Sequence, residues 1–166
     1  MTQGQRETVI LELFEKNNKT ILRILLDWKV YKYLSEPLQE EIFLDLFRSG
    51  MFFKVSHKNM DFTEMYELLS EPAKHELLNL LINEEGVISI KECGVRKIPQ
   101  EIQGFEIRKL VLLRNKLTEI PSWITNLTQL EVLDLRVNQI KQLPDFVGKM
   151  EALKVLRLDQ NTIKKI

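Results

Sequence analysis

The second half of the chain repeats one arrangement of apolar residues around a single asparagine. Asn115, Asn138 and Asn161 are spaced by 23 residues, and each has apolar residues eight, five and three positions before it and two and five positions after it. The three apolar sets are Ile107, Leu110, Leu112, Leu117 and Ile120; Leu130, Leu133, Leu135, Ile140 and Leu143; and Leu153, Leu156, Leu158, Ile163 and Ile166. This spacing follows neither the 3.6-residue period of a helix nor the simple alternation of a strand. It predicts a repeated unit that combines a strand with a turn and a return segment.

Prolines mark the second part of each unit. Pro121 and Pro144 follow two of the asparagine sets, and apolar residues stand three, six and nine positions after each proline. Counting back from Pro99 identifies an earlier unit, in which Cys93 occupies the asparagine position. These residues resemble the pattern L-x-x-L-x-L-x-x-N-x-L of the leucine-rich repeat family, in the intracellular type of roughly 23 residues. The resemblance covers residues 85–166, which hold about four units.

The resemblance implies an α/β solenoid, a short right-handed leucine-rich repeat array with a parallel β-sheet. In such an array each unit adds a strand, turns a corner and returns along the convex side, and only stacked neighbours close the core. We expect the asparagine to turn inward at the corner and to bind backbone groups that lack ladder partners. Cys93 is expected inside the array, where a thiol is usually inert.

The first half of the chain is predicted to be helical. Ser-Glu-Pro recurs at residues 35–37 and 70–72, with a serine that can cap a helix and a proline that fits its first turn. Asp61 with Glu64 forms a capping-box pattern. We expect five helices, near residues 6–16, 19–33, 36–48, 62–69 and 71–83. They form an α-helical N-terminal capping domain, residues 1–84, which is either a small bundle or a short array of helical hairpins. A leucine-rich repeat domain, residues 85–166, follows.

The ends of a solenoid expose apolar core and unpaired strand edges. Only Glu84, Glu85 and Gly86 separate the last predicted helix from the first strand, so we expect the helical part to seal the first coil. At the other end the pattern stops at Ile166. One hypothesis for that end is self-association of the chain through the edge at residues 153–163.

Strand side chains that alternate with the buried leucines face the concave side, where such arrays present an extended binding surface. The predicted partner-binding residues on this face are Lys91, Lys109, Val111, Leu113, Val132, Asp134, Arg136, Val155, Arg157 and Asp159. Asp134 is expected beside Arg157 and Arg136 beside Asp159, so that charges cross between neighbouring strands. Such a patch, apolar in the middle and charged at the rim, favours a protein partner. The alternative is that these charges only neutralise each other on a solvated sheet, where exposed pairs contribute little stability.

Charge and composition narrow the class of protein. The 24 Lys and Arg residues match the 24 Asp and Glu residues, which gives no reason to expect nucleic acid or an anionic membrane as a partner. No apolar stretch reaches the roughly 18 residues of a membrane span, so we expect a cytoplasmic location. His57, His75 and the only cysteine, Cys93, have no spacing that suits a metal, and a glycine-rich phosphate loop is missing. The sequence therefore predicts a non-enzymatic protein without a cofactor or a metal.

Three functional hypotheses fit these features. The leading interpretation is a protein–protein interaction module, an adaptor or scaffold that recognises a protein partner with its concave face. An alternative is the substrate-recognition fragment of a larger multidomain enzyme such as a ubiquitin ligase, although the paired prolines typical of bacterial ligases are missing from these repeats. The third hypothesis is a self-assembling structural protein whose repeats stack end to end.

Overall fold

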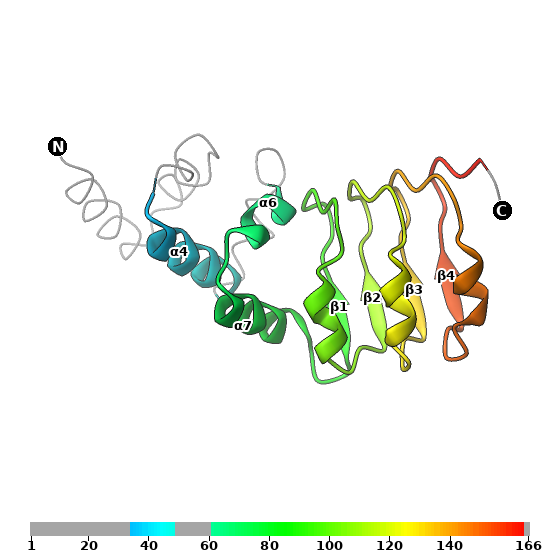
Figure 1. Cartoon of the computed structure of the whole chain (residues 1–166), viewed down its shortest axis with the longest axis horizontal. Coiled ribbons are helices and arrows are strands. Elements are labelled where there is room, and N and C mark those ends of the chain that lie inside the picture. Colours follow the sequence, from blue (N-terminus) through cyan, green and yellow to red (C-terminus); the bar gives the residue numbers. More distant parts are fainter. Residues whose placement is uncertain (1–33, 49–60, 165–166) are drawn as a thin grey trace.

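The structure is a computed structural model that describes residues 34–48 and 61–164. Helices α4 (Glu36–Arg48), α6 (Phe62–Glu67) and α7 (Glu71–Leu81) come first, and four short strands follow. Figure 1 shows the strands side by side, with α6 and α7 at the β1 end of the sheet. The helices predicted near residues 6–16 and 19–33 lie outside the described residues.

The sheet is parallel, and its strands follow the order of the chain. β1 (Val87–Ser89) pairs with β2 (Lys109–Val111), β2 with β3 (Val132–Asp134), and β3 with β4 (Val155–Arg157). Backbone hydrogen bonds extend this ladder beyond the strands; the N–H of Leu135, for example, donates to the carbonyl of Arg157 at 2.9 Å. Sheet and return segments together form the solenoid-like α/β fold that the repeats predict.

Three short 3-10 helices form the return segments, which lie along one side of the sheet (Figure 1). They are η1 (Gln100–Gly104), η2 (Ser122–Asn126) and η3 (Asp145–Lys149), and each starts directly after the proline of its unit. The fixed φ of proline suits this position, where a backbone N–H would have no helical partner. Each of these helices buries one aliphatic side chain: Ile102, Ile124 and Val147, respectively. Apolar residues from both sides of each coil therefore meet in one narrow core.

The asparagine side chains join each coil to the coil before it. Oδ1 of Asn138 accepts the N–H of Leu117 at 3.0 Å, and its Nδ2 donates to the carbonyls of Leu112 at 2.9 Å and Leu135 at 3.0 Å. The other two asparagines of the series make equivalent bonds across neighbouring coils. These hydrogen bonds confirm the inward corner position predicted for the asparagines. Asn138 is also buried, at 6 % exposure.

A residue in the left-handed conformation precedes every corner position. Glu92, Arg114, Val137 and Gln160 have φ values of 58°, 55°, 57° and 57°. Any residue other than glycine is strained in this conformation, by about 1–3 kcal/mol. The strain recurs because the chain must reverse its direction at once if the next side chain is to point into the corner. The hydrogen bonds of that side chain offset the cost.

Backbone and side-chain groups of Asn83 cover the free edge of β1. Its backbone N–H donates to the carbonyl of Val87 at 3.1 Å, and its Oδ1 accepts the N–H of Val87 at 2.8 Å. Directly before it, Ile82 forms an antiparallel bridge with Ile88. The edge is thereby paired at its start, which removes the template that an open strand offers to other chains.

Helix α6 covers the corner of the first unit. The N–H of Phe62 donates to the carbonyl of Cys93 at 2.9 Å, and the N–H of Arg96 donates to the hydroxyl of Thr63 at 2.8 Å. Cys93 is 0 % exposed, in agreement with its predicted interior position. A cysteine is sufficient here because no earlier coil stands in front of it, and helix α6 bonds other backbone groups of this corner.

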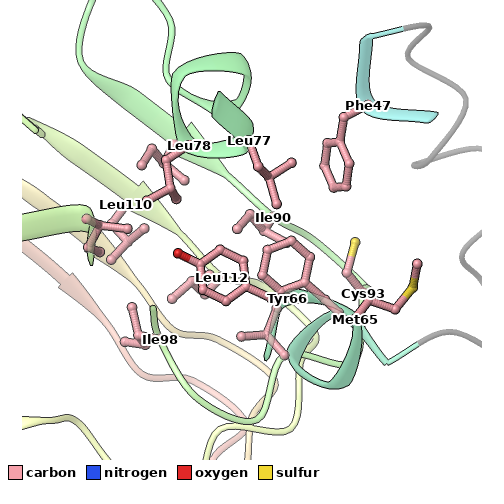
Figure 2. Close-up of a cluster of buried hydrophobic side chains, with 14 of the residues drawn as sticks. Phe47, Met65, Tyr66, Leu77, Leu78, Ile90, Cys93, Ile98, Leu110 and Leu112 are labelled. Carbon is pink, nitrogen blue, oxygen red and sulfur yellow. The ribbon is translucent and has the colours of Figure 1, made fainter. Parts of the chain in front are cut away.

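One buried apolar cluster extends from α4 to η3. Figure 2 shows side chains of the helices and of the first two coils gathered in it: Phe47, Met65, Tyr66, Leu77 and Leu78 come from the helices, and Ile90, Cys93, Ile98, Leu110 and Leu112 from the coils. The helices and the repeats thus share a core. The domain boundary near residue 84 stays a prediction.

The helix boundaries differ from the predicted ones where the chain enters the sheet. Helix α4 covers residues 36–48 as predicted, but α6 ends at Glu67 and α7 at Leu81, each two residues earlier than expected. Ile82 has extended dihedral angles because it bridges to Ile88, so α7 cannot continue. Two of the three predicted caps are confirmed, since Asp61 accepts the N–H of Thr63 at 3.1 Å and Ser70 accepts that of Ala73 at 3.4 Å. The cap by Ser35 stays a prediction.

Gly86 sets the approach of the chain to the second coil. Its φ is +72°, and a Cβ at this position would lie 2.8 Å from the carbonyl oxygen of Glu106. Its own carbonyl accepts the N–H of Arg108 at 2.8 Å and that of Lys109 at 3.2 Å. Only a residue without a side chain satisfies both the turn and this close approach.

Replacing Asn138 with leucine should destabilise the protein strongly. The substitution leaves the backbone groups of Leu112, Leu117 and Leu135 without their hydrogen bonds to the Asn138 amide, at about 1–3 kcal/mol for each buried group. We expect a loss of about 3 kcal/mol or more in the free energy of unfolding, measured by urea denaturation. Gln139→Leu, at the exposed neighbouring position, is the control and should change it by no more than about 0.5 kcal/mol. Equal losses in the two variants would contradict the asparagine's role.

Replacing Gly86 with alanine should also lower the free energy of unfolding, by about 1–3 kcal/mol, because of its left-handed φ. The control is Gly104→Ala, since a Cβ there meets no atom within 4 Å. Thermal or urea denaturation of both variants should show a loss at Gly86 and none at Gly104. A fully stable G86A protein would mean that the junction tolerates a different turn.

Candidate functional site

The open sheet face is the face of the sheet that points away from the return segments. Strand side chains alternate between the two faces, and Ile88, Leu110 and Leu133 fill the core with exposures of 0 %, 1 % and 0 %. The positions between them form the open sheet face: Val87, Ser89 and Lys91; Lys109, Val111 and Leu113; Val132, Asp134 and Arg136; Val155, Arg157 and Asp159. Val87, Lys109, Val132 and Val155 stand in one row across the strands.

The ten predicted partner-binding residues differ in exposure. Lys91, Lys109, Arg157 and Asp159 are exposed. Leu113, Val132, Arg136 and Val155 are half-buried. Val111 and Asp134 are buried, at 6 % and 2 % exposure. These two residues therefore form the floor of the face, and the others form the surface that a partner can reach.

Asp134 lies at the centre of the face between two arginines. Nε of Arg136 donates to its Oδ1 at 2.9 Å and Nη2 to its Oδ2 at 2.6 Å, so one guanidinium binds both carboxylate oxygens. From the next strand, Nη1 of Arg157 approaches Oδ2 at 3.5 Å. The Asp134 side chain is 3 % exposed, whereas those of Arg136 and Arg157 are 36 % and 48 % exposed. The carboxylate is thus covered by guanidinium groups whose outer sides face solvent.

Hydrogen bonds keep this cluster charged. The Arg136 guanidinium lowers the pKa of Asp134 below its ordinary value of 3.8, against the opposing effect of burial. The Asp134 carboxylate in turn raises the pKa of Arg136, with a smaller contribution from the charge of Asp159. At neutral pH the three side chains therefore carry one negative and two positive charges, which leaves the cluster with one excess positive charge.

The whole open sheet face is basic. Its cations are Lys91, Lys109, Arg136 and Arg157, and its anions are Asp134 and Asp159. Four against two leaves a net charge of +2, although the complete chain is neutral. Beside the charged cluster, Val132 and Val155 form a half-buried apolar strip. The face therefore combines positive charge with an adjoining apolar surface.

The main bond of the cluster was not predicted. Asp134 does lie in register with Arg157, as expected. Arg136 also stands beside Asp159, as expected, since the N–H of Val137 donates to the carbonyl of Asp159 at 2.9 Å and the charge of Asp159 helps to raise the pKa of Arg136. The side-chain hydrogen bonds of Arg136, however, go to Asp134, two residues earlier in the same coil. Residues two apart in a strand share a face, so the spacing Asp-x-Arg was the signal that could have identified this pair.

A pocket of about 320 Å³ lies between helices α6 and α7 and the first return segments. Tyr66, Pro99, Pro121 and Trp123 are among its lining residues. Its charged lining residues balance, with Lys74, Arg96 and Lys97 against Glu67, Glu101 and Glu119. The Tyr66 hydroxyl is buried, and burial raises its pKa far above the ordinary value, with help from the negative charge of Glu101. The pocket has apolar walls and no net charge for the recognition of an ion.

The described residues considered for catalysis, His75 and Cys93, contact an aromatic ring and a backbone carbonyl. The ring of His75 lies 5.1 Å from that of Phe105, and the thiol of buried Cys93 donates to the carbonyl of Lys91 at 3.0 Å. His57 lies outside the described residues. Residues 34–48 and 61–164 hold no group of three or more His, Cys, Asp or Glu side chains that could bind a metal ion. Within the same residues, no helix has the length and apolar character needed to cross a membrane.

Comparison with known families identifies the repeats. The family model for leucine rich repeats matches residues 105–163, a segment that includes β2, β3 and β4. No curated protein matches the chain. The chain therefore contains a leucine-rich repeat region, as its spacing of asparagines and leucines predicted. Leucine-rich repeat domains generally mediate protein–protein interaction and are typically not enzymes.

Removal of the Asp134 charge should cost stability in a pH-dependent way. The folded pKa of Asp134 lies below 3.8, so its charged form stabilises the protein above that pH, and this contribution disappears as the pH falls through the folded pKa. We expect Asp134→Asn to lower the free energy of unfolding by about 1–3 kcal/mol at neutral pH. Urea denaturation across a pH series should show this difference shrinking below about pH 4. Asp145→Asn, at an exposed position, is the control. A difference that stays constant down to about pH 2 would contradict the role of the charge.

Proposed function

We propose that this chain is a protein-binding module, an adaptor or scaffold, which recognises a protein partner with the open sheet face. The observation that carries the proposal is the cluster of Asp134, Arg136 and Arg157 at the centre of that face. The leucine-rich repeat match supports the same function, because domains of this kind generally mediate protein–protein interaction.

The fold does not depend on this kind of cluster. Removing the Asp134 carboxylate from water costs free energy, which its hydrogen bonds with the arginines offset. At the equivalent register position of β2, Val111 fills the same place with a buried apolar side chain, so the fold does not require an acid there. Fixed charges on an exposed surface do contribute to the choice of partner and to the rate of encounter.

The other two hypotheses make different use of the repeats. In a larger enzyme, the open sheet face would bind the substrate, and the recognition chemistry would be the same. Self-assembly would instead bring residues 153–163 of two copies together, and one observation favours it: Leu156 and Leu158 are half-buried, whereas the equivalent Leu133 and Leu135 are 0 % exposed.

A charge reversal on the open sheet face should remove the partner. The variant is Lys109→Glu with Arg157→Glu, which spares Arg136 because its loss would leave the buried Asp134 carboxylate without its main partner. Proximity labelling with the full chain in its native cells should mark a set of proteins whose labelling falls at least about tenfold in this variant, the equivalent of 1.4 kcal/mol. The cause is the loss of complementary charge at the contact surface.

The matched control is Lys116→Glu with Lys149→Glu, two exposed positions away from the open sheet face that give the same change in net charge. It should leave the labelled set unchanged. Light-scattering mass of all three proteins separates recognition from self-assembly. Recognition predicts equal masses. The proposal fails if all three proteins label the same set, or if the lost partner is only a second copy of the chain.

A further inference from the structure

The donors of the two arginines are only partly used within the protein. Arg136 bonds Asp134 through Nε and Nη2, and Arg157 approaches it through Nη1 alone. Nη1 of Arg136 and both Nε and Nη2 of Arg157 have no hydrogen-bond partner among the described residues. Asp134 neutralises one of the two positive charges. The pair of arginines therefore keeps one excess positive charge and several N–H groups without a hydrogen-bond acceptor. Guanidinium groups of this kind can bind both oxygens of a carboxylate.

The Asp134 carboxylate holds this donor set in position. A free arginine side chain loses much conformational freedom when it binds an anion, whereas the Arg136 guanidinium is already fixed by two hydrogen bonds. A fixed donor set binds its acceptor at a lower entropic cost. Asp134 is therefore a positioning residue for the arginines, and the arginines are the groups that contact the partner.

The side chains around the cluster indicate which kind of residue lies beside the acidic residue of the partner. Val132 and Val155 lie half-buried on one side of the cluster, and Leu113, two residues after the end of β2, is also half-buried. A partner group that contacts both kinds of surface must carry an apolar side chain beside its carboxylate. Exposed Lys109, in the same row as the two valines, adds a further positive charge for a second acid.

The size of the face suits a segment of chain. Four strands span three inter-strand spacings of about 4.8 Å, or about 14 Å, and an extended chain covers this distance with about four to five residues at 3.3 Å each. The described face is thus wide enough for a short extended segment that crosses the strands.

From these features we infer that the open sheet face binds an extended acidic segment of a partner protein, with an Asp or Glu carboxylate held by Arg136 and Arg157 and an apolar side chain on Val132 and Val155. The inference rests on the proposed function and adds the chemistry of the partner to it. Nucleic acid offers the negative charge without the aliphatic neighbour that the valine strip accommodates.

Selection from a random peptide library tests this chemistry without a known partner. The full wild-type chain is immobilised beside two variants, Arg157→Gln and the control Lys149→Gln on η3. The wild type and the control should enrich peptides that carry Asp or Glu next to Val, Leu or Ile. In the Arg157→Gln variant the enrichment of acidic residues should disappear.

Affinity measurements then show which groups are coupled. One selected peptide is compared with an analogue in which Gln and Asn replace its Glu and Asp residues. The wild-type protein should bind the analogue at least about tenfold more weakly, whereas Arg157→Gln should bind both peptides with equal affinity. The same test applies to the double variant Asp134→Asn with Arg136→Gln, which removes the buried acid together with its partner and keeps the net charge. Its affinity for the acidic peptide should also fall by about tenfold, a loss that general charge attraction does not produce.

Two results would overturn the inference. One is enrichment of peptides without a preference for acidic residues, and the other is the absence of any enrichment over the empty support. Either result leaves the proposed function standing if the proximity-labelling difference between Lys109→Glu with Arg157→Glu and its control persists. Loss of that difference would instead remove the proposed function itself. Unchanged affinity of the double variant for the acidic peptide would mean that Arg136, as held by Asp134, does not contact the carboxylate.

Discussion

Hydrogen bonds of the asparagine side chains hold the coils of this protein in register. At each corner the backbone leaves the sheet ladder while still inside the apolar core, where an unpaired N–H or carbonyl is costly. The amide of Asn138 solves this by accepting from Leu117 of the earlier coil and donating to the ends of two strands. The left-handed residue before each corner is the conformational cost of that geometry. Because the bond is repeated, the strands of successive coils align residue for residue.

The first coil has no earlier neighbour, and the helices take its place. Helix α6 bonds the corner at Cys93, and Asn83 after α7 bonds the edge of β1. Their side chains also enter the same apolar core as the coils (Figure 2). A stack of repeats is stabilised only by contacts between neighbours, so this contact matters for every coil behind it. An apolar cysteine can occupy the asparagine position here because no earlier coil stands in front of it to receive the bonds of an asparagine.

Alignment of the strands is also what creates the open sheet face. Register places the Asp134 carboxylate beside Arg157 of the next strand, while alternation places it beside Arg136 of its own. The buried acid under two half-exposed arginines fixes positive charge at the centre of a surface that is open to solvent. The same register sets Val132 and Val155 side by side as an apolar strip next to the charges. The strand register that packs the core therefore also decides which side chains are neighbours on the open sheet face.

The sequence by itself determined the repeat, its parallel sheet and the inward asparagines. Each position of the unit faces the same side in every coil, so the residues that face the core recur every 23 residues in the sequence. It also identified the capping residues Asp61 and Ser70, since capping is a local interaction. Only the tertiary structure decided where α7 ends, because Ile82 leaves the helix to bridge with Ile88. It likewise decided that Val111 and Asp134 are buried on a face expected to be exposed, and that Arg136 bonds within its own strand. Side-chain length, burial and competing partners select one ion pair among several that the register allows, and these depend on coordinates that no local pattern carries.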